Sequence, residues 1–515
     1  MRVTVILPKP SAYFPDITTT GLRIPRASAL TIATVIKNLG HEVKLYIEQI
    51  DDRINWDWVY KSDVVCFSLL TLIANRGYQL ASRVRENSNA VIIMGGSHPS
   101  AEAEDCLNYC DYVVRNEGDG TITELLKAIE TQSPVDDISG ISYKKPGKVV
   151  HNKNREYLSQ FNVAFDHRLI EGFKVGFVAR ISDFLRTRRI RNPCMVITIT
   201  RECPFNCSFC YSIRLLGRKH RKREISAVFN EITSNLRYFS SRRYLITDNN
   251  FFANLNYSKE FMRRLIKLNL HLKITAFGRL EIGKDEELLS LMKASGITRV
   301  FCGIESVNQN TLNSFNKKLQ VDEIREYIRN FHKHGIAIMG SFIVGADTDE
   351  RNCVQEIVDF AIENHLEYLC MFTLHDFPYQ EKQFHIEQLI PDHRILSRNW
   401  NHFSGTNVVI YPKKIKPSTL QKEVMNGYKR FYSTKRLIDT LFTNGWRSFS
   451  ESACGRYSVM PAVRSMEKHI SFLKEMEEGL YDKKEVLLEE KLLSRYTRSK
   501  ETRHEDKPAQ LVHNR

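Results

Sequence analysis

The segment MVITITRECPFNCSFCYS (195–212) joins a short apolar run to three closely spaced cysteines. The apolar residues at its start predict a buried strand. Cys203, Cys207 and Cys210 follow directly, on the loop expected at the carboxyl end of that strand. A β/α barrel carries its chemistry on loops at this end of its strands. The segment therefore predicts the first strand of a β/α domain and a metal-binding loop at its end.

The chain after this segment repeats the same alternation of strand and helix. Helical segments such as 285–296, 321–335 and 351–365 separate the apolar runs. Six β/α units fit a partial barrel better than a closed eightfold one. The predicted strands are 195–203, 244–248, 272–281, 299–306, 337–345 and 368–377.

The number of cysteines in the loop bears on the kind of metal. Structural zinc sites favour paired C-x2-C units closed by a fourth ligand. This loop has no second pair, and His220 in a basic stretch is a poor substitute. An iron–sulfur cube normally takes four thiolates, so three leave one iron with an open position. An open coordination position is typical of catalytic rather than structural metal sites.

Residues 1–145 form an earlier α/β series. Helical patterns at 27–40, 75–88 and 121–130 lie between short β-rich runs. This alternation predicts a parallel, doubly wound, Rossmann-like sheet that binds its ligand at the carboxyl ends of its strands. The predicted strands are 2–8, 41–47, 63–70, 90–96 and 111–118.

The remaining chain divides by composition. Residues 146–193 lack a clean pattern and are interpreted as a connector between the first domain and a barrel domain at 194–385. Residues 386–480 are predicted to be a helical C-terminal region, and the charged tail 481–515 is expected to be disordered.

The composition indicates a globular protein. Hydrophobic residues make up 42% of 515, and neither a bilayer-spanning apolar run nor a signal-peptide pattern is present. Eleven cysteines, mostly scattered singly, do not resemble a disulfide framework, so a cytoplasmic location is expected. The net charge of +15 fits nucleic acid, an anionic membrane surface, acidic small molecules, or simply solvated loops and a basic tail.

The C-x3-C-x2-C motif, with Phe209 before its last cysteine, resembles that of the radical S-adenosylmethionine (SAM) family. In that family three cysteines hold a [4Fe–4S] cluster, and the amino and carboxylate groups of SAM chelate the fourth iron. The reduced cluster then cleaves a carbon–sulfur bond, and the resulting 5′-deoxyadenosyl radical abstracts hydrogen from an unactivated carbon.

The resemblance also implies SAM contacts at the ends of later strands. Asp248 and Asn249 would hold the amino group, and Arg279, Glu305 and Ser306 the ribose and carboxylate. Glycines on the fifth strand would let the backbone approach the adenosine. Taken singly, each of these residues could equally be an ordinary salt bridge or turn residue. The implied SAM-binding residues are Phe209, Asp248, Asn249, Arg279, Glu305, Ser306, Gly340 and Gly345.

The N-terminal domain resembles a cobalamin-binding domain. The motif SLL (68–70), with Ser68 and Leu70, would contact the lower base, and Gly95 and Gly96 would let the nucleotide tail lie against the sheet. The family's D-x-H-x-x-G motif appears as DITTTG (16–21), with Thr18 in place of histidine. A hydroxyl is a poor cobalt ligand beside imidazole, so bound cobalamin is expected to have an empty or water-occupied lower face. A generic nucleotide site or a purely structural domain is the alternative.

Together these features predict an enzyme that methylates an unactivated carbon of a lipid, tetrapyrrole or natural product. Oxidative cyclisation or rearrangement of a tetrapyrrole-like substrate is a second interpretation. RNA modification of the methylthiotransferase kind is a third, although Cys66, Cys106 and Cys110 lack the spacing of that group.

The sixth strand and the expected partners complete the sequence-based interpretation. In LHDFPYQ (374–380), His375, Asp376 and Tyr379 are candidate substrate contacts, with packing or capping as the alternative. The expected partners are a hydrophobic or acidic small molecule and an electron donor such as flavodoxin or ferredoxin. A nucleic-acid partner is not expected.

Overall fold

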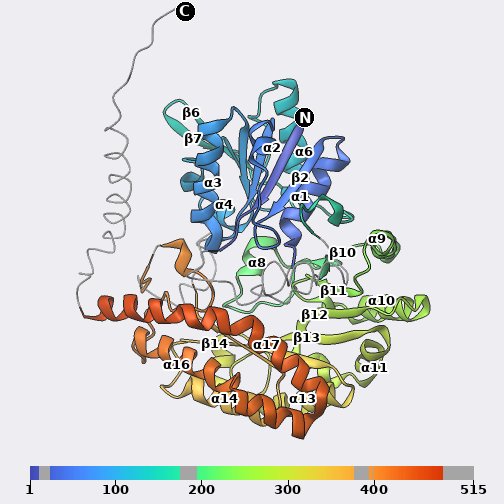
Figure 1. Ribbon diagram of the computed structural model, residues 1–515, viewed down its shortest axis with the longest axis vertical. Coiled ribbons are helices and arrows are strands. Elements are labelled where there is room, and N and C mark those ends of the chain that lie inside the picture. Colours follow the sequence, from blue (N-terminus) through green and yellow to red (C-terminus); the bar gives the residue numbers. More distant parts are fainter. Residues whose placement is uncertain (11–23, 174–193, 376–393, 398, 479–515) are drawn as a thin grey trace, which may run out of the picture.

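The computed structural model describes residues 1–10, 24–173, 194–375, 394–397 and 399–478. Two α/β parts lie one above the other in the view of Figure 1, and the C-terminal helices pack against the second. Among the described residues, no helix combines the length and the apolar character needed to cross a bilayer.

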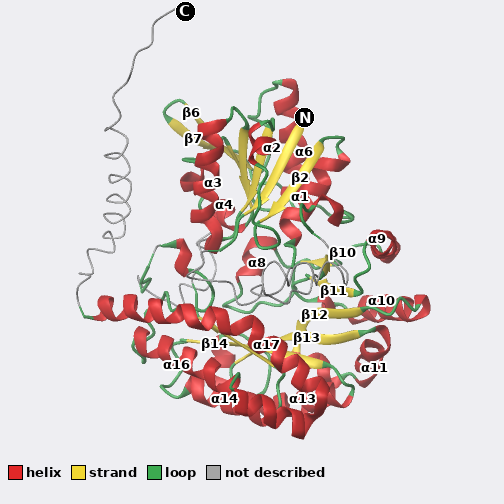
Figure 2. Cartoon of the chain, in the orientation of Figure 1, coloured by secondary structure: helices red, strands yellow, loops and turns green. Residues whose placement is uncertain are grey.

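The first part is a sheet with helices on both faces (Figure 2). Among the described residues its strand order is β2-β1-β3-β4-β5-β6-β7, and the first five of these run parallel. This is the predicted doubly wound arrangement, with the order 2-1-3-4-5 typical of flavodoxin-like sheets. The strands are β1 (Arg2–Leu7), β2 (Glu42–Ile47), β3 (Val64–Ser68), β4 (Val91–Gly95), β5 (Tyr112–Val114), β6 (Ile141–Lys145) and β7 (Lys148–His151).

Helices and an antiparallel hairpin complete the first domain around this sheet. Helices α1 (Ala27–Asn38) and α6 (Gly118–Thr131) contact each other on one face. The antiparallel hairpin of β6 and β7 extends the sheet to His151, beyond the domain boundary expected at residue 145. The other helices are α2 (Trp56–Tyr60), α3 (Ala74–Asn87), α4 (Ser97–Ala101) and α5 (Ala103–Cys106).

The second part is the predicted partial barrel. In the described chain its strands pair in the order β15-β14-β13-β12-β11-β8, all parallel, and the two outer strands do not pair with each other. The sheet is therefore open. Its strands are β8 (Met195–Ile197), β11 (Arg243–Ile246), β12 (Lys273–Arg279), β13 (Ile297–Glu305), β14 (Ala337–Val344) and β15 (Tyr368–Thr373). Its helices are α9 (Ile225–Tyr238), α10 (Leu255–Leu268), α11 (Glu286–Ser295), α12 (Gln309–Ser314), α13 (Val321–Lys333) and α14 (Cys353–Glu363).

Helices α16 (Pro417–Phe431) and α17 (Thr434–Glu477) form the predicted helical C-terminal region, and α17 is kinked at Gly445. Tyr428 in α16 and Tyr432 at the C-cap of this helix cover the edge strand β15. The Tyr428 hydroxyl accepts from Met371 N (2.6 Å) and donates to Met371 O (2.8 Å). Tyr432 bonds both backbone groups of Leu369 in the same way. Side chains thus satisfy backbone groups that an open edge would leave unpaired.

A short hairpin of β9 (Thr200–Arg201) and β10 (Arg221–Lys222) brackets the cysteine loop, and helix α8 (Tyr211–Leu216) lies within that bracket. This hairpin lies near the junction of the two α/β parts (Figure 1). The expected disordered tail, 481–515, lies outside the described residues.

Candidate active site

The three cysteines lie on the loop between β9 and α8 and line one cavity of about 530 Å³. None is in a disulfide. Burial raises the pKa of Cys207, against the opposing effect of Lys317 and Arg279, and burial raises the pKa of Cys210 to about 11. Because iron binds thiolates, metal binding here must release protons from these thiols.

Three thiols on one loop are the donor set that an iron–sulfur cluster with one open iron requires. Within the described residues, no three His, Cys, Asp or Glu side chains form a group that could hold one metal ion. Cysteines around an iron–sulfur cube bind different irons, so their sulfur atoms need not converge on one point. The donor set of Cys203, Cys207 and Cys210 fits three corners of a [4Fe–4S] cluster with one iron left open.

Four predicted SAM residues line the same cavity: Phe209, Asn249, Arg279 and Glu305. Arg279 Nη1 lies 3.7 Å from Cys207 Sγ, and its guanidinium stacks 4.1 Å from the centre of the Phe205 ring. Its charge is partnered by Glu281. A cation beside a cysteine of the loop favours the charged form of the sulfur.

Glu305 ends β13 with a left-handed backbone (φ 73°) and is buried. Burial raises the pKa of its carboxyl group, against the charge of Lys317, whose Nζ lies 3.3 Å from Oε1. Lys317 also lines the cavity and is only 4% exposed in its side chain. Sequence analysis did not identify Lys317, because a lysine in NKKLQ carries no motif.

Asp248 does not reach the cavity. Its carboxylate accepts hydrogen bonds from Ile199 N (2.8 Å), Thr200 N (2.7 Å) and Thr200 Oγ1 (2.8 Å). Burial raises its pKa to about 7, against the lowering effect of these bonds. The side chain thus ties the end of β11 to the segment that enters the cysteine loop. Its neighbour Asn249 lines the cavity instead.

Three other predicted residues have packing roles and do not line the cavity. The Ser306 hydroxyl accepts from Asn308 N (3.0 Å), and Gly345 N donates to the Asp349 carboxylate (2.8 Å). A Cβ at Gly340 would lie 2.8 Å from the side chain of Leu366. For Ser306, Gly340 and Gly345 the observed contacts agree with the ordinary structural alternative.

His375 is the described member of the predicted substrate set, and Asp376 and Tyr379 lie outside the described residues. His375 lines the cavity and is buried, which lowers its pKa to about 4. Its Nδ1 donates to Thr373 O at 2.8 Å. Phe403 and Gly405, from the segment before α16, also line this cavity. Their placement depends on tertiary packing, so no local pattern identified them.

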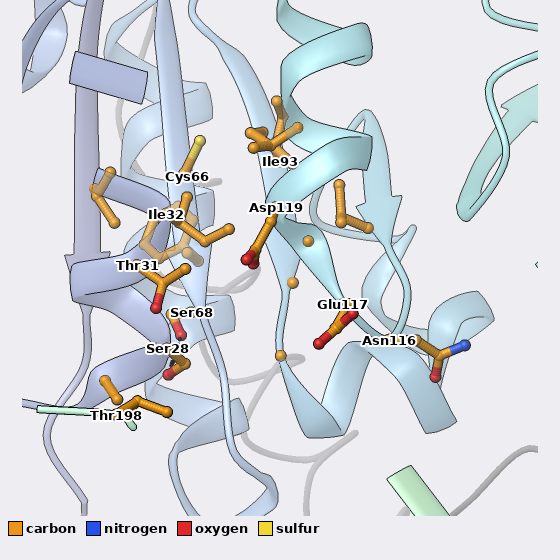
Figure 3. Close-up of a pocket in the computed structure, with 18 of the residues that line it drawn as sticks. Ser28, Thr31, Ile32, Cys66, Ser68, Ile93, Asn116, Glu117, Asp119 and Thr198 are labelled. Atoms are coloured by element: carbon orange, nitrogen blue, oxygen red, sulfur yellow. Dashed lines mark hydrogen bonds between the residues drawn. The ribbon is translucent and has the colours of Figure 1, made fainter. Parts of the chain in front are cut away.

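A second cavity, of about 230 Å³, lies at the carboxyl ends of β3 and β4 in the N-terminal domain, and Thr198, Arg201, Leu216 and Thr247 of the barrel domain complete its wall. Figure 3 shows Ser28, Thr31 and Ser68 on one side of this cavity and Glu117 and Asp119 across from them. Such a position, outside the carboxyl ends of the strands, is the usual ligand site of an open α/β sheet.

The motif residues of the N-terminal domain fit the tail of a corrinoid. Ser68, Gly95 and Gly96 line the smaller cavity, whereas Leu70 lines the larger one. Gly96 has φ 109°, and a Cβ there would lie 2.5 Å from Leu69 O, so a side chain would disrupt the turn. Bare backbone at these glycines leaves room for a ligand against the sheet.

Position 18 lies outside the described residues, and among the described residues no histidine lines the smaller cavity. His98 is fully buried, its Nε2 is 2.8 Å from the Tyr78 hydroxyl, and its ring packs on Trp400. His41 Nδ1 lies 3.3 Å from the amino terminus. Neither lines either cavity.

Comparison with known families identifies both cofactor-binding domains. The model of the B12 binding domain matches residues 15–126, and that of the Radical SAM superfamily matches residues 197–361. The chain belongs to the radical SAM enzymes that carry a cobalamin-binding domain. The predicted cofactors of this enzyme, a [4Fe–4S] cluster, SAM and cobalamin, follow from that membership and are confirmed.

Several relatives match this radical SAM enzyme over most of both chains. It is 25% identical to the bacteriochlorophyllide d C-8(2)-methyltransferase of Chlorobaculum tepidum, over 80% of this chain and 86% of the relative. It is 23% identical to the anaerobic magnesium-protoporphyrin IX monomethyl ester cyclase of Rubrivivax gelatinosus, over 81% and 76%. The solved structure of the methyltransferase TsrM from Kitasatospora setae, with cobalamin and a [4Fe–4S] cluster bound, has a TM-score of 0.56 and 16% identity, over 74% and 73%. That structure supports the fold assignment.

Proposed function

We propose that this radical SAM enzyme transfers a methyl group to an unactivated carbon of a largely hydrophobic small molecule. The single observation that carries the proposal is the composition of the larger cavity. Its wall combines the cluster cysteines with residues of the cobalamin-binding domain, including Leu70, Leu72 and Ser97. Residues of both domains thus line one cavity.

When bound, the cluster with SAM supplies hydrogen abstraction and cobalamin supplies a transferable methyl group. The chain's own residues hold and orient these groups. Cys203, Cys207 and Cys210 bind the cluster, and the Asn249 side chain is placed to bind the SAM amino group. Arg279 and Lys317 provide positive charge for the SAM carboxylate beside Cys207.

The substrate class follows from the wall of the larger cavity. Besides the residues expected to hold the cluster and SAM, aromatic and aliphatic side chains form a large part of this wall, which suits a largely hydrophobic organic molecule. Such a wall also keeps water away from reactive species. His375 and Ser404 are the polar groups expected to orient the substrate, which we place among lipids, tetrapyrroles or other natural products. The apolar wall includes Phe205, Phe277, Phe301, Ile343, Phe372, Leu374 and Phe403.

Oxidative ring formation is the second candidate function. It is favoured by the similarity to the magnesium-protoporphyrin cyclase. The reactions differ in the fate of the SAM methyl group, which reaches the product only in methyl transfer.

The test uses the full chain, reconstituted anaerobically with iron, sulfide and cobalamin and supplied with SAM deuterated on its methyl group. Candidate tetrapyrroles and isoprenoid lipids are added, and products are analysed by mass spectrometry. We expect a product heavier by one CD₃ group that replaces hydrogen. A dehydrogenated product without deuterium would favour the cyclase instead, and neither product with any candidate would count against the substrate class.

We further propose that flavodoxin or ferredoxin supplies the electron, because these acidic carriers complement a chain of net charge +15. The free thiols and the cluster loop suit a reducing compartment such as the cytoplasm.

A further inference from the structure

A buried network of ion pairs joins the two domains beside the smaller cavity and next to the cluster loop. We call it the inter-domain network; it consists of Glu117, Asp119, Arg201, Glu202 and Arg221. None of these side chains is more than 12% exposed. Buried ion pairs are often no more stabilising than packed apolar residues, so a network of this size points to a role in geometry.

The network begins at the start of α6 in the cobalamin-binding domain. Arg221 donates from Nη1 (2.9 Å) and Nη2 (2.8 Å) to the two carboxylate oxygens of Glu117. Arg201 Nη1 adds a further bond to Glu117 (2.8 Å), and Arg201 Nη2 pairs with Asp119 (2.8 Å). Two-point contacts of this kind fix orientation as well as distance.

The same arginine then reaches the cluster loop. Arg221 Nε donates to Glu202 Oε1 (3.0 Å), and Glu202 Oε2 accepts from His220 N (3.0 Å). Glu202 is fully buried, has φ 73° and directly precedes Cys203. A non-glycine residue in the left-handed region persists only when its surroundings hold it there. The backbone entering the cluster loop is therefore held by Arg221, which Glu117 holds from the other domain.

The network also borders the smaller cavity, because Glu117, Asp119 and Arg201 form part of its wall. A ligand in this cavity packs against the start of α6 and against β9, and so restrains the residues that orient Arg221. A loop that is already ordered loses less freedom when a second ligand binds to it.

We propose that Glu117 and Arg221 are positioning residues that couple filling of the smaller cavity by the tail of cobalamin to SAM binding at the cluster loop. The inference rests on the cofactor sites of the proposed function and extends them to communication between the sites. Linkage requires the effect to be reciprocal, so SAM must strengthen cobalamin binding by the same factor.

The test measures the SAM dissociation constant by anaerobic equilibrium dialysis of the reconstituted full chain, with and without hydroxocobalamin. In the wild type we expect cobalamin to lower this constant by about fivefold or more. Glu117→Gln keeps the side-chain size. In this variant the SAM dissociation constant without cobalamin, divided by the constant with cobalamin, should fall close to one while iron content is retained. Glu124→Gln is the matched control, since Glu124 lies on the same helix, is 51% exposed and pairs only at the surface with Arg155. It should keep the wild-type ratio.

Arg221→Lys provides a second variant, because it keeps the charge but loses the two-point contact, and it too should lose the coupling. If circular dichroism shows that Glu117→Gln is unfolded, the effect of cobalamin on SAM binding in Arg221→Lys decides the question. A wild type without coupling, or a variant that retains it, would overturn the inference alone. Absence of cobalamin binding in the wild type would overturn both the inference and the proposed function.

Discussion

The Lys317 ammonium lies 3.3 Å from the Glu305 carboxylate, in the wall of the cavity that Cys207 also lines. Both side chains are less than 10% exposed. This buried pair brings a fixed positive charge close to the cluster loop and to the position expected for the SAM carboxylate.

Replacing Lys317 by Met should weaken SAM binding by about tenfold or more, because a hydrogen bond to a charged group contributes about 1.5–3 kcal/mol. Equilibrium dialysis against the reconstituted protein measures this, with iron content as a check on the cluster. Lys318→Met is the control, since Lys318 is adjacent in sequence but exposed. Equal SAM affinity in the two variants would show that Lys317 does not bind SAM.

Asp248 and Asn249 are neighbours with different expected roles. Asp248→Asn should lower the free energy of unfolding by about 1–3 kcal/mol, because it replaces an acceptor of three buried hydrogen bonds by an amide. Asn249→Ala should instead raise the SAM dissociation constant and leave stability nearly unchanged. Urea titration measures the effect on stability, and dialysis measures the effect on SAM binding. Weaker SAM binding with unchanged stability in Asp248→Asn would show that Asp248 binds SAM.

The contrast between these neighbours shows where sequence analysis reached its limit. The alternation of strands and helices predicted both sheets, and the cysteine spacing predicted the loop at the end of the first barrel strand. Whether a residue just past β11 points toward the cavity or toward Thr200 depends on how β11 sits against β8. That register is a tertiary property which no motif encodes.

Other omissions have different causes. Lys317 and Phe403 reach the cavity only through packing between distant segments. The β6–β7 hairpin, by contrast, had a local signal, because Pro146 and Gly147 form a turn between two β-rich runs. Arg221 lies next to His220 in a basic stretch, and solvated loops are one explanation that the sequence offers for such charge, but the side chain of Arg221 is buried.

Acid should destabilise this protein through its buried histidines. Burial lowers the pKa of His402 to about 3 and that of His469 to about 4, whereas an unfolded histidine titrates near 6.5. Below pH 6.5 the unfolded state therefore binds protons that the native state does not. The stability that these neutral side chains contribute is complete above pH 6.5 and is lost as the pH falls toward 4.

Each of these histidines should lower the free energy of unfolding by up to about 1.4 kcal/mol per pH unit in that window. Denaturant unfolding at pH 7.5, 6.5 and 5.5 measures the slope, and His469→Asn should make it shallower. A slope that is the same in the variant and the wild type would show that His469 takes up its proton equally in both states.

The central claim is that Cys203, Cys207 and Cys210 hold one [4Fe–4S] cluster that cleaves SAM. The most direct measurement is iron and sulfide content, together with 5′-deoxyadenosine formation, in the wild type and in the variant with all three cysteines replaced by Ala. After anaerobic reconstitution the wild type should hold about four iron and four sulfide per chain and form 5′-deoxyadenosine under reduction. The variant should lose both the cluster and the product. Wild-type iron, sulfide and 5′-deoxyadenosine in the variant would contradict the account.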